Sequence, residues 1–298
     1  MTRIRITWLI VGLLLALSTM AVAGCGSDDS SNASGGGGEI ALVAYSTPQQ
    51  AYEDGVIPGF QETPDGEGVE FSTSFGASGD QRRAVESGLP ADVVAFSLEP
   101  DMTKTVEAGL VAKDWSSDEH KGMVTDSVVV LSVRPGNPKG IEGWNDLVRD
   151  DVDIITPNPA TSGGAKWNIM AAYGSQIEQG KSEQEALDFV KQVLANTSVQ
   201  DDSARDSLQT FAGGKGDVLI GYENEAIQAQ DEDVELEFVI PGETILIENP
   251  IAATTDGGDA AQRFVDYTRT EDAQQLFADR GYRPVVKSVL EANRDRLP

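Results

Sequence analysis

The feature that most restricts the fold is the regular alternation of strand-like and helix-like segments from residue 39 onward. Short apolar runs rich in Val and Ile predict strands, and longer runs with helical periodicity lie between them. This alternation predicts an α/β fold with mainly parallel sheets. The predicted strands are 40–44, 69–75, 92–95, 128–133, 152–155, 217–221, 236–240 and 245–247, and the predicted helices are 49–60, 81–87, 101–108, 166–179, 183–195, 203–212, 223–230, 259–267 and 271–278.

Two long β-branched runs, 123–134 and 245–254, are typical of strands that cross between two parts of a fold. Two such crossings would divide the chain into lobe one, residues 39–127 plus 250–298, and lobe two, residues 128–249. Ligands of α/β sheets bind where strand ends meet helix starts. We therefore expect a ligand cleft between the lobes, closed by a hinge of two crossover segments.

The N-terminal residues read as processing signals. Residues 1–24 predict a secretory signal, with Arg3 and Arg5 before an apolar stretch that is too short for a membrane span. The run Val22-Ala23-Gly24-Cys25 resembles a bacterial lipobox, which implies cleavage before Cys25 and lipid on its sulfur. The alternative is a plain signal peptide followed by a chance cysteine. Residues 25–38, rich in Gly and Ser, predict a flexible tether.

The chain is strongly acidic, with 49 Asp and Glu against 22 Lys and Arg, which gives a formal net charge of −27. The charge therefore disfavours nucleic acid and anionic lipid as partners, and membrane contact is expected only through the lipid. Cys25 is the only cysteine, so no intramolecular disulfide can form. An anionic ligand would have to be held by local hydrogen-bond donors.

The sharpest candidate for such donors follows the predicted strand 152–155. There the sequence Pro157-Asn158-Pro159-Ala160-Thr161-Ser162-Gly163-Gly164-Ala165 leads into a predicted helix. Helix starts expose unpaired backbone amides at the positive end of the helix dipole, and glycine lets a ligand approach them closely. The segment therefore indicates an anion site, with an ordinary capped helix start as the alternative.

Four further segments occupy similar junctions, at 45–49, 75–81, 201–206 and 221–226. Each alone fits a cap or a turn. Together, in this order and spacing, they resemble the sulfate-binding solute receptors of bacterial ABC importers, over nearly all of residues 40–284. The residues that carry the resemblance are Tyr45, Gly76-Ala77-Ser78-Gly79, Ala91-Asp92-Val93-Val94, Arg134, Gly136-Asn137-Pro138, Trp144-Asn145-Asp146-Leu147, Ile155-Thr156-Pro157-Asn158-Pro159, Thr161-Ser162-Gly163-Gly164-Ala165-Lys166-Trp167-Asn168, Ala204-Arg205, Thr210-Phe211, Gly216-Asp217-Val218-Leu219-Ile220, Glu223-Asn224-Glu225-Ala226 and Tyr282-Arg283-Pro284.

The resemblance implies a type II, two-lobed periplasmic-binding-protein fold. It also implies a monomeric, extracytoplasmic receptor that is held at the cell membrane by the lipid on Cys25. Such a receptor delivers sulfate to the permease of an ABC importer, without a cofactor and without enzyme activity. Carried over by position, the sulfate donors would be the amides of Ser46, Ser78, Gly163, Gly164 and Ala204, the hydroxyl of Ser162, and Tyr222.

This sequence departs from the family pattern at three positions in or near the set of residues that would donate to sulfate. Tyr222 stands where the family has an indole donor, and Ser46 stands where an acid is common. Asp80 stands where a basic residue is common. It would either complement the dipole of its helix or accept the proton of a phosphate. The chain also ends soon after Pro284, where family members often continue.

Other oxyanions remain open as ligands, namely thiosulfate, phosphate and molybdate. A secreted hydrolase is a further alternative, as is a surface protein that keeps the fold without the ligand. His120 is the only histidine and lies in a polar stretch, no Gly-x-Ser-x-Gly elbow is present, and no His-rich or Cys-rich metal pattern occurs. Arg205 would either touch the anion or form an ion pair beside the site.

Overall fold

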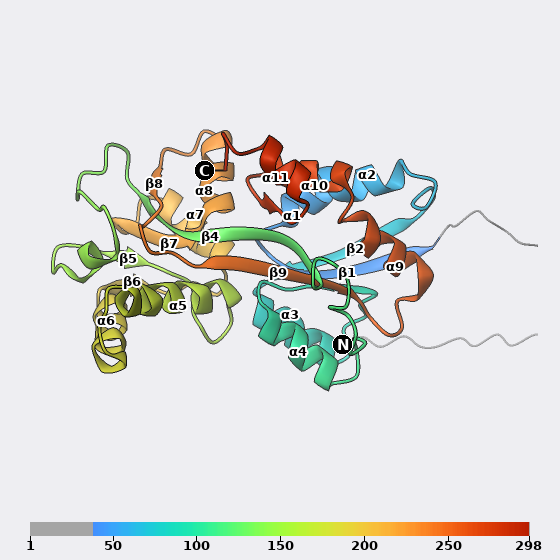
Figure 1. Ribbon diagram of the computed structural model, residues 1–298, viewed down its shortest axis with the longest axis horizontal. Helices are drawn as coiled ribbons and strands as arrows, with labels where there is room; N and C mark the ends of the chain where they lie inside the picture. The colour runs from blue at the N-terminus through green and yellow to red at the C-terminus, as the bar shows by residue number, and fades with distance from the viewer. Residues whose placement is uncertain (1–37, 298) are drawn as a thin grey trace, which may run out of the picture. The chain divides into compact units, whose positions relative to one another are not determined.

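The structure is a computed structural model that describes residues 38–297 (Figure 1). The predicted signal peptide, Cys25 and nearly all of the tether lie outside the described residues. Within the described range no helix is long and apolar enough to cross a membrane.

Strands and helices alternate along the described chain, as the sequence pattern predicts. The strands are β1 (Glu39–Tyr45), β2 (Glu70–Gly76), β3 (Val93–Ala95), β4 (Met123–Val133), β5 (Ile154–Ile155), β6 (Thr197–Val199), β7 (Val218–Tyr222), β8 (Glu237–Val239), β9 (Leu246–Ala253) and β10 (Arg283–Pro284). The helices are α1 (Gln49–Ala51), the π-helical η1 (Tyr52–Val56), α2 (Ile57–Gln61), α3 (Ser78–Glu86), α4 (Glu99–Glu107), the 3₁₀ helix η2 (Trp144–Val148), α5 (Gly163–Glu178), α6 (Glu183–Ala195), α7 (Ala204–Ala212), α8 (Glu223–Asp231), α9 (Gly258–Tyr267), α10 (Glu271–Ala278) and α11 (Lys287–Ala292).

The strands join in the order β2-β1-β3-β9-β4-β7-β5-β6, with β8 and β10 also paired to β4. Strand β1 is parallel to β2 and β3, and β5 is parallel to β6 and β7. In contrast, β4 and β9 run antiparallel to every partner that they have. The prediction of mainly parallel sheets is therefore correct inside each group of strands and wrong for the two long strands that link the groups.

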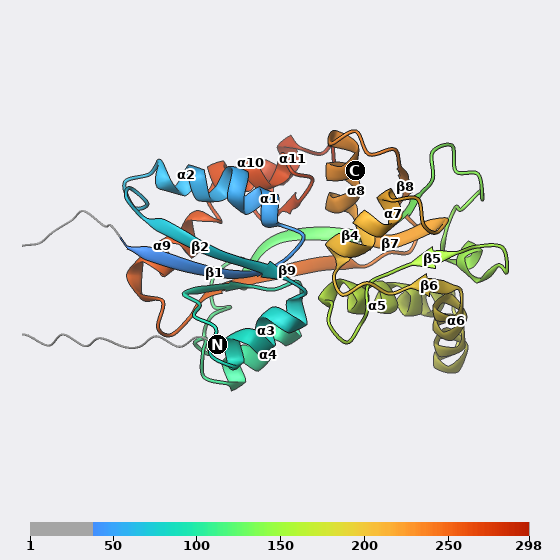
Figure 2. The ribbon, with the colours of Figure 1, turned by 180° about the vertical axis from the view of Figure 1, so that it is seen from behind.

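The two long strands lie side by side between the two groups (Figures 1 and 2). They pair from Met123 with Pro250 to Val128 with Leu246, with an irregularity between Met123 and Thr125. Beyond this region β4 continues along β7, while β9 continues along β3 in the other direction. The long apolar runs at 123–134 and 245–254 thus form the predicted crossing segments. The molecule has the two-lobed α/β architecture of type II periplasmic binding proteins.

Lobe one is the part built around β1, and its sheet is covered on both faces. Side chains of a strand alternate between the faces, so neighbouring residues of β1 enter different cores. Ile40, Leu42 and Ala44 pack against α1, η1, α2, α9 and α10, whereas Val43 packs against α3 and α4. The near-continuous apolar sequence of β1 follows from this double burial.

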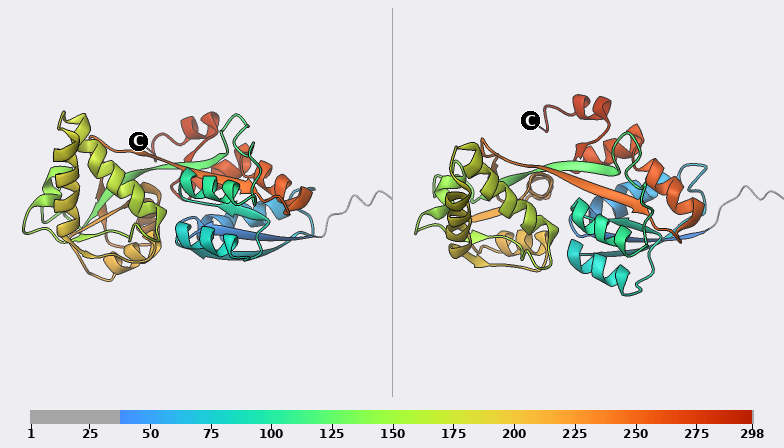
Figure 3. Two further views of the ribbon diagram at one scale, coloured as in Figure 1. Left: turned by 90° about the horizontal axis from the view of Figure 1, so that it is seen from below. Right: turned by 60° about the horizontal axis from the view of Figure 1, so that its bottom comes forward.

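Lobe two is the part built around β7, and it repeats this arrangement (Figure 3). In β7, Val218, Ile220 and Tyr222 belong to the core beneath α5 and α6, while Leu219 packs against α7 and α8. The strands β1, β2, β3, β5, β6 and β7 are each followed by a helix that covers the sheet. Backbone amides from several helix starts can meet at the edge where such strands end.

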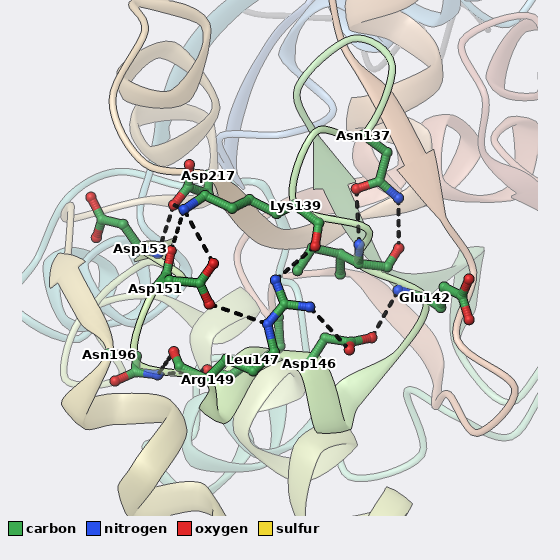
Figure 4. A network of polar contacts seen from close by, with 11 residues as sticks. Asn137, Lys139, Glu142, Asp146, Leu147, Arg149, Asp151, Asp153, Asn196 and Asp217 are labelled. Atoms are coloured by element: carbon green, nitrogen blue, oxygen red, sulfur yellow. Dashed lines mark hydrogen bonds and ion pairs between the residues drawn. The ribbon is translucent and has the colours of Figure 1, made fainter.

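A polar network fixes the long connection between β4 and β5 (Figure 4). Asn137 closes a turn by exchanging two hydrogen bonds with the backbone of Ile141. Arg149 donates to the Lys139 carbonyl at 2.7 Å, and the Lys139 amine lies 3.5 Å from the Asp217 carboxylate. The Asp217 carboxylate also accepts the Asp153 amide, which ties the connection to β7.

Two helices whose first residues are Ser and Gly begin three residues earlier than predicted. Helix α3 begins at Ser78 and not at 81, and α5 begins at Gly163 and not at 166. Both helices open on two residues of low helix propensity, Ser78-Gly79 and Gly163-Gly164, so periodicity does not reveal these starts. Strands β6 and β10 and helices η2 and α11 are too short to give a periodic signal, and they were not predicted.

Candidate functional site

A small cavity lies where the strand ends of both lobes meet. About 190 Å³ of space free of protein atoms lies in it, part of which is open to solvent. All seven residues predicted as anion donors line it, so the structure brings together five junctions that are distant in sequence. The lining residues are Tyr45, Ser46, Thr47, Ala77, Ser78, Ser97, Ser162, Gly163, Gly164, Ser203, Ala204 and Tyr222.

Each predicted donor occupies a strand end or a helix start. Ser46 follows the last residue of β1, and Ser78 is the first residue of α3. Gly163 and Gly164 open α5, and Ala204 opens α7. Tyr222 is the last residue of β7 and directly precedes α8.

Buried Asn168 holds the start of α5 against β7 and the loop after β5. Its side-chain amide donates to the Thr156 hydroxyl at 2.9 Å and to the Ile220 carbonyl at 2.8 Å. These two bonds anchor the first turns of α5 both to the loop after β5 and to β7. The glycine amides are therefore held in place by a buried side chain of the same helix.

The backbone amides of Ser46, Ser78, Gly163, Gly164 and Ala204 make no hydrogen bond to another group in the described part of the chain. Four of them stand in the first turn of a helix, where no intrahelical acceptor exists. They also lie at the positive ends of three helix dipoles. The cavity is thus lined by unsatisfied neutral donors, which is a favourable environment for an anion.

Ser162 serves as the N-cap of α5 and lines the cavity at the same time. Its hydroxyl oxygen accepts a hydrogen bond from the Ala165 amide at 3.4 Å. A hydroxyl that accepts in this way keeps its own proton for donation. The capped-helix interpretation and the anion-donor interpretation of Ser162 are therefore compatible.

Tyr222 is buried, and its hydroxyl has no hydrogen-bond partner among the residues described. Burial raises the pKa of Tyr222 well above its usual value, and the neighbouring Tyr45 adds to this, while the nearby Ser97 hydroxyl opposes it. The phenol therefore stays neutral at physiological pH and can offer a proton to an anion. Like an indole N–H, the phenol O–H can donate one hydrogen bond, although the two side chains differ in shape.

Five lining residues were not predicted as site residues, namely Tyr45, Thr47, Ala77, Ser97 and Ser203. Ser97 follows the short strand β3 and is 1% exposed. Its position after a strand end was a signal of the same kind as the others. However, the sequence Phe96-Ser97-Leu98 holds no glycine or amide side chain that would have marked it.

Hydrogen bonds connect the two lobes around the cavity. The Gly79 amide donates to the Thr161 carbonyl at 2.9 Å, and the Trp167 indole donates to the Ser97 carbonyl at 2.7 Å. Gly163 packs so closely against lobe one that a Cβ there would lie 1.7 Å from the Ser97 hydroxyl oxygen. The lobes are therefore in direct contact around the cavity.

Arg205 forms contacts beside the cavity and does not line it. Its guanidinium donates to the Thr47 carbonyl at 2.9 Å and lies 3.8 Å from the Glu225 carboxylate. Burial raises the pKa of Glu225 to about 7, and Arg205 partly opposes this shift. The ion-pair interpretation of Arg205 agrees with this geometry.

Asp80 does not line the cavity. Its side chain is 49% exposed, lies in the first turn of α3 and forms an ion pair with Arg83. This position fits the role of complementing the helix dipole.

Among residues 38–297 no group of three or more His, Cys, Asp or Glu side chains is arranged to hold a metal ion. His120 lies away from the cavity, with its imidazole 3.8 Å from the Glu119 carboxylate. No His, Asp, Glu or Lys side chain is among the lining residues.

Comparison with known proteins gives the family. Residues 40–283 match the family described as bacterial extracellular solute-binding protein. The sulfate-binding protein of Synechococcus elongatus is 38% identical over 290 residues, covering 93% of this chain and 83% of that protein. The thiosulfate-binding protein of Pseudomonas aeruginosa is 32% identical over 270 residues, covering 86% of this chain and 81% of that protein.

A solved structure gives the same result. The sulfate-binding protein SubI from Mycobacterium tuberculosis H37Rv superposes with a TM-score of 0.84 at 42% identity, covering 87% of this chain and 91% of that chain. The match to binding proteins confirms the prediction of a receptor and not an enzyme. The chain belongs to the bacterial extracellular solute-binding proteins, within the group that contains the sulfate-binding proteins.

Proposed function

We propose that the protein is the sulfate receptor of an ABC importer and that the cavity between its lobes is the sulfate site. The observation that carries this proposal is the convergence of five unsatisfied amides and two hydroxyls on one small cavity. The names of the relatives support sulfate as the ligand, and one of them supports thiosulfate.

The energetics of the seven donors agree with a dianion. Burial of an unpaired dianion is very costly. Seven donors, each contributing about 1–3 kcal/mol to a charged acceptor, offset that cost. Binding in the micromolar range requires a net gain of roughly 8 kcal/mol. Fully ionised sulfate carries acceptors only, so a set of donors suits all of its oxygens.

We assign residues 39–127 and 250–298 to lobe one and residues 128–249 to lobe two. The core clusters support these boundaries, because those around β1 and β7 are composed mainly of residues from the respective ranges. The strands β4 and β9 then form the hinge, and bending there would open the cavity to solvent. The receptor acts as a monomer that presents the closed form to the permease.

Isothermal titration of the domain from residue 39 with sulfate, thiosulfate, molybdate and phosphate tests the ligand assignment. We expect sulfate to bind in the micromolar range or tighter, with a ratio of one ligand per chain. Tighter binding of thiosulfate or molybdate would keep the receptor function and change its ligand. No heat with any oxyanion would contradict the receptor function.

Substitution of Ser162 tests the contribution of one side-chain donor. Ser162→Ala should weaken sulfate binding by roughly 1–3 kcal/mol, because one buried oxygen of the anion loses its partner. The same change also removes the cap of α5, which costs the fold about 1 kcal/mol. Ser182→Ala, which removes the cap of α6 away from the cavity, controls for the loss of stability. Equal affinity in both variants would remove the Ser162 hydroxyl from the site.

We further propose that Cys25 carries the lipid that holds the receptor at the outer face of the cell membrane. The lipobox-like run before Cys25 and the Gly- and Ser-rich tether after it support this proposal. Cys25→Ala should release the protein into the medium, as measured by fractionation and immunoblotting. A variant that is cleaved and still found in the membrane fraction would refute the lipid anchor.

A further inference from the structure

One buried backbone carbonyl, that of Ser97, accepts hydrogen bonds from two other parts of the protein. The indole of Trp167 in α5 donates to it at 2.7 Å, and the side-chain amide of Asn249 in β9 donates to it at 3.1 Å. Ser97 and Asn249 are 1% and 0% exposed, and a carbonyl oxygen has two lone pairs for two donors. A helix of lobe two and a strand of the hinge therefore meet lobe one at this single atom.

The side chain of Asn249 is oriented by the other hinge strand. Thr125 of β4 is paired with Asn249 of β9, and the Thr125 hydroxyl donates to the side-chain oxygen of Asn249 at 3.2 Å. Both residues are buried. Because the oxygen of Asn249 accepts from Thr125, its amide is the group that faces the Ser97 carbonyl.

The amide of Ser97 is fixed at the same time by the wall of the cavity. It donates to the Ser78 hydroxyl at 3.2 Å, and this hydroxyl donates to the Asp101 carboxylate at 2.8 Å. All three residues belong to lobe one, and Ser78 is one of the predicted anion donors. The position of the Ser97 peptide is therefore set without any contribution from α5, and its carbonyl is a preformed acceptor for lobe two.

Trp167 is carried by the helix that supplies the two glycine amides. It lies four residues after Gly163 and therefore on the same face of α5. That face packs on Ser97, because a Cβ on Gly163 would lie 1.7 Å from the Ser97 hydroxyl oxygen. Neither Trp167 nor Asn249 lines the cavity. Helix α5 can thus offer its first amides to a ligand and its indole to the opposite lobe.

We infer that Trp167 is a positioning residue for anion binding, which holds the lobes together by donating to the Ser97 carbonyl, and that Asn249 keeps this carbonyl in place from the hinge. The inference rests on the proposed anion site. Trp167 and Ser97 belong to different lobes, so opening at the hinge breaks their bond. A contact that exists only in the closed form raises the affinity for a ligand that favours this form, without touching the ligand.

Trp167→Phe tests the contact, because it removes the indole donor and keeps an aromatic ring. Trp144→Phe is the matched control, since the Trp144 indole also donates to a carbonyl at 2.7 Å, that of Glu243 within lobe two. Calorimetry gives the sulfate affinity, and release of radiolabelled sulfate into excess unlabelled sulfate gives the dissociation rate. We expect Trp167→Phe to raise Kd about three- to tenfold through faster dissociation, with an unchanged association rate. Trp144→Phe should bind sulfate like the unaltered protein.

Thr125→Val tests the contribution of the hinge, because it removes the hydroxyl that orients Asn249 and nearly keeps the shape of the side chain. If Asn249 holds the Ser97 carbonyl in place, Trp167→Phe should cost less sulfate affinity in the Thr125→Val background than alone. Losses that simply multiply, when Kd is measured for both single variants and the double variant, would overturn the role of Asn249.

The indole proton of Trp167 separates this inference from the sulfate assignment. The domain from residue 39 contains Trp115, Trp144 and Trp167, so the NMR signal that disappears in Trp167→Phe identifies this proton. Sulfate should slow its exchange with solvent. Sulfate binding that leaves this exchange fast, or that Trp167→Phe does not weaken, would overturn the inference and leave the receptor function intact.

No sulfate binding by the unaltered protein would contradict the proposed function instead. A Trp167 indole proton that is protected from exchange in that protein would still support the contact between the lobes, and an unprotected one would overturn it as well. A weaker affinity of Trp167→Phe with an unchanged dissociation rate would also count against the inference, because a contact formed on closure acts on release of the ligand.

Discussion

Gly163→Ala should weaken sulfate binding by roughly 1–3 kcal/mol, which corresponds to about a five- to 150-fold rise in Kd. The added Cβ would lie 1.7 Å from the Ser97 hydroxyl oxygen and 2.2 Å from a methyl carbon of Leu98. Both atoms belong to the opposite lobe, so the lobes could not approach to their present separation. The Gly163 amide is retained in this variant, and only closure is affected.

Gly174→Ala in the same helix is the matched control, because no atom lies within 4 Å of the Cβ that it would add. This change should stabilise α5 slightly and leave sulfate binding unaltered. Calorimetry gives the affinities, and thermal unfolding without ligand shows that both variants are folded. If Gly163→Ala bound sulfate as tightly as Gly174→Ala, the observed contact between the lobes would not belong to the bound state.

The parts of the fold that the sequence predicted well are those with strong local signals. Helix α6 has the predicted ends, because Ser182 and Glu185 form a capping box before an amphipathic run. The strands β4 and β9 were recognised as crossing segments by their length and apolar content. Their antiparallel pairing could not be predicted, because it depends on how the two lobes are joined.

The candidate site shows the same division between local and tertiary information. Gly163 and Gly164 could be identified as anion donors from the sequence, because two glycines after Ser162 mark a helix start whose backbone amides a ligand can approach closely. Ser97 could not, because its role depends on β3 lying between β1 and β9, which brings a single serine next to Gly163. The engagement of the Ser78 hydroxyl by Asp101 was equally invisible, since the two residues are 23 positions apart.

Arg205 pairs with Glu225 and so does not supply a positive charge to the anion site. The formal net charge of −27 opposes anion binding at long range, and no cation lines the cavity. Arg205 uses its charge to connect the Thr47 carbonyl with the Glu225 carboxylate and not to neutralise a ligand. Selection of the ligand is therefore left to hydrogen-bond geometry, and individual donors should have large effects.

Ala204→Pro is the change that removes one such donor with the least disturbance of the fold. Ala204 is the first residue of α7, and proline is favoured at this position because the amide there has no intrahelical partner. The preceding Ser203 is already extended, with φ −130° and ψ 165°, as a residue before proline must be. We expect a loss of about 1.5–3 kcal/mol in sulfate binding, since a hydrogen bond to a charged ligand is lost.

Glu183→Pro places proline at the same position of α6, which also follows an extended serine cap and lies away from the cavity. It should fold and bind sulfate like the unaltered protein, and it controls for any general effect of proline at a helix start.

In Ala204→Pro the ring carbon replaces the amide proton, so the variant loses the donor and gains a methylene that faces the ligand. Both effects lower affinity, and a glycine at the same position separates them, because Ala204→Gly keeps the amide and adds no bulk. Full affinity in Ala204→Pro, with the helix intact by circular dichroism, would mean that α7 supplies no donor and that the anion lies nearer to α3 and α5.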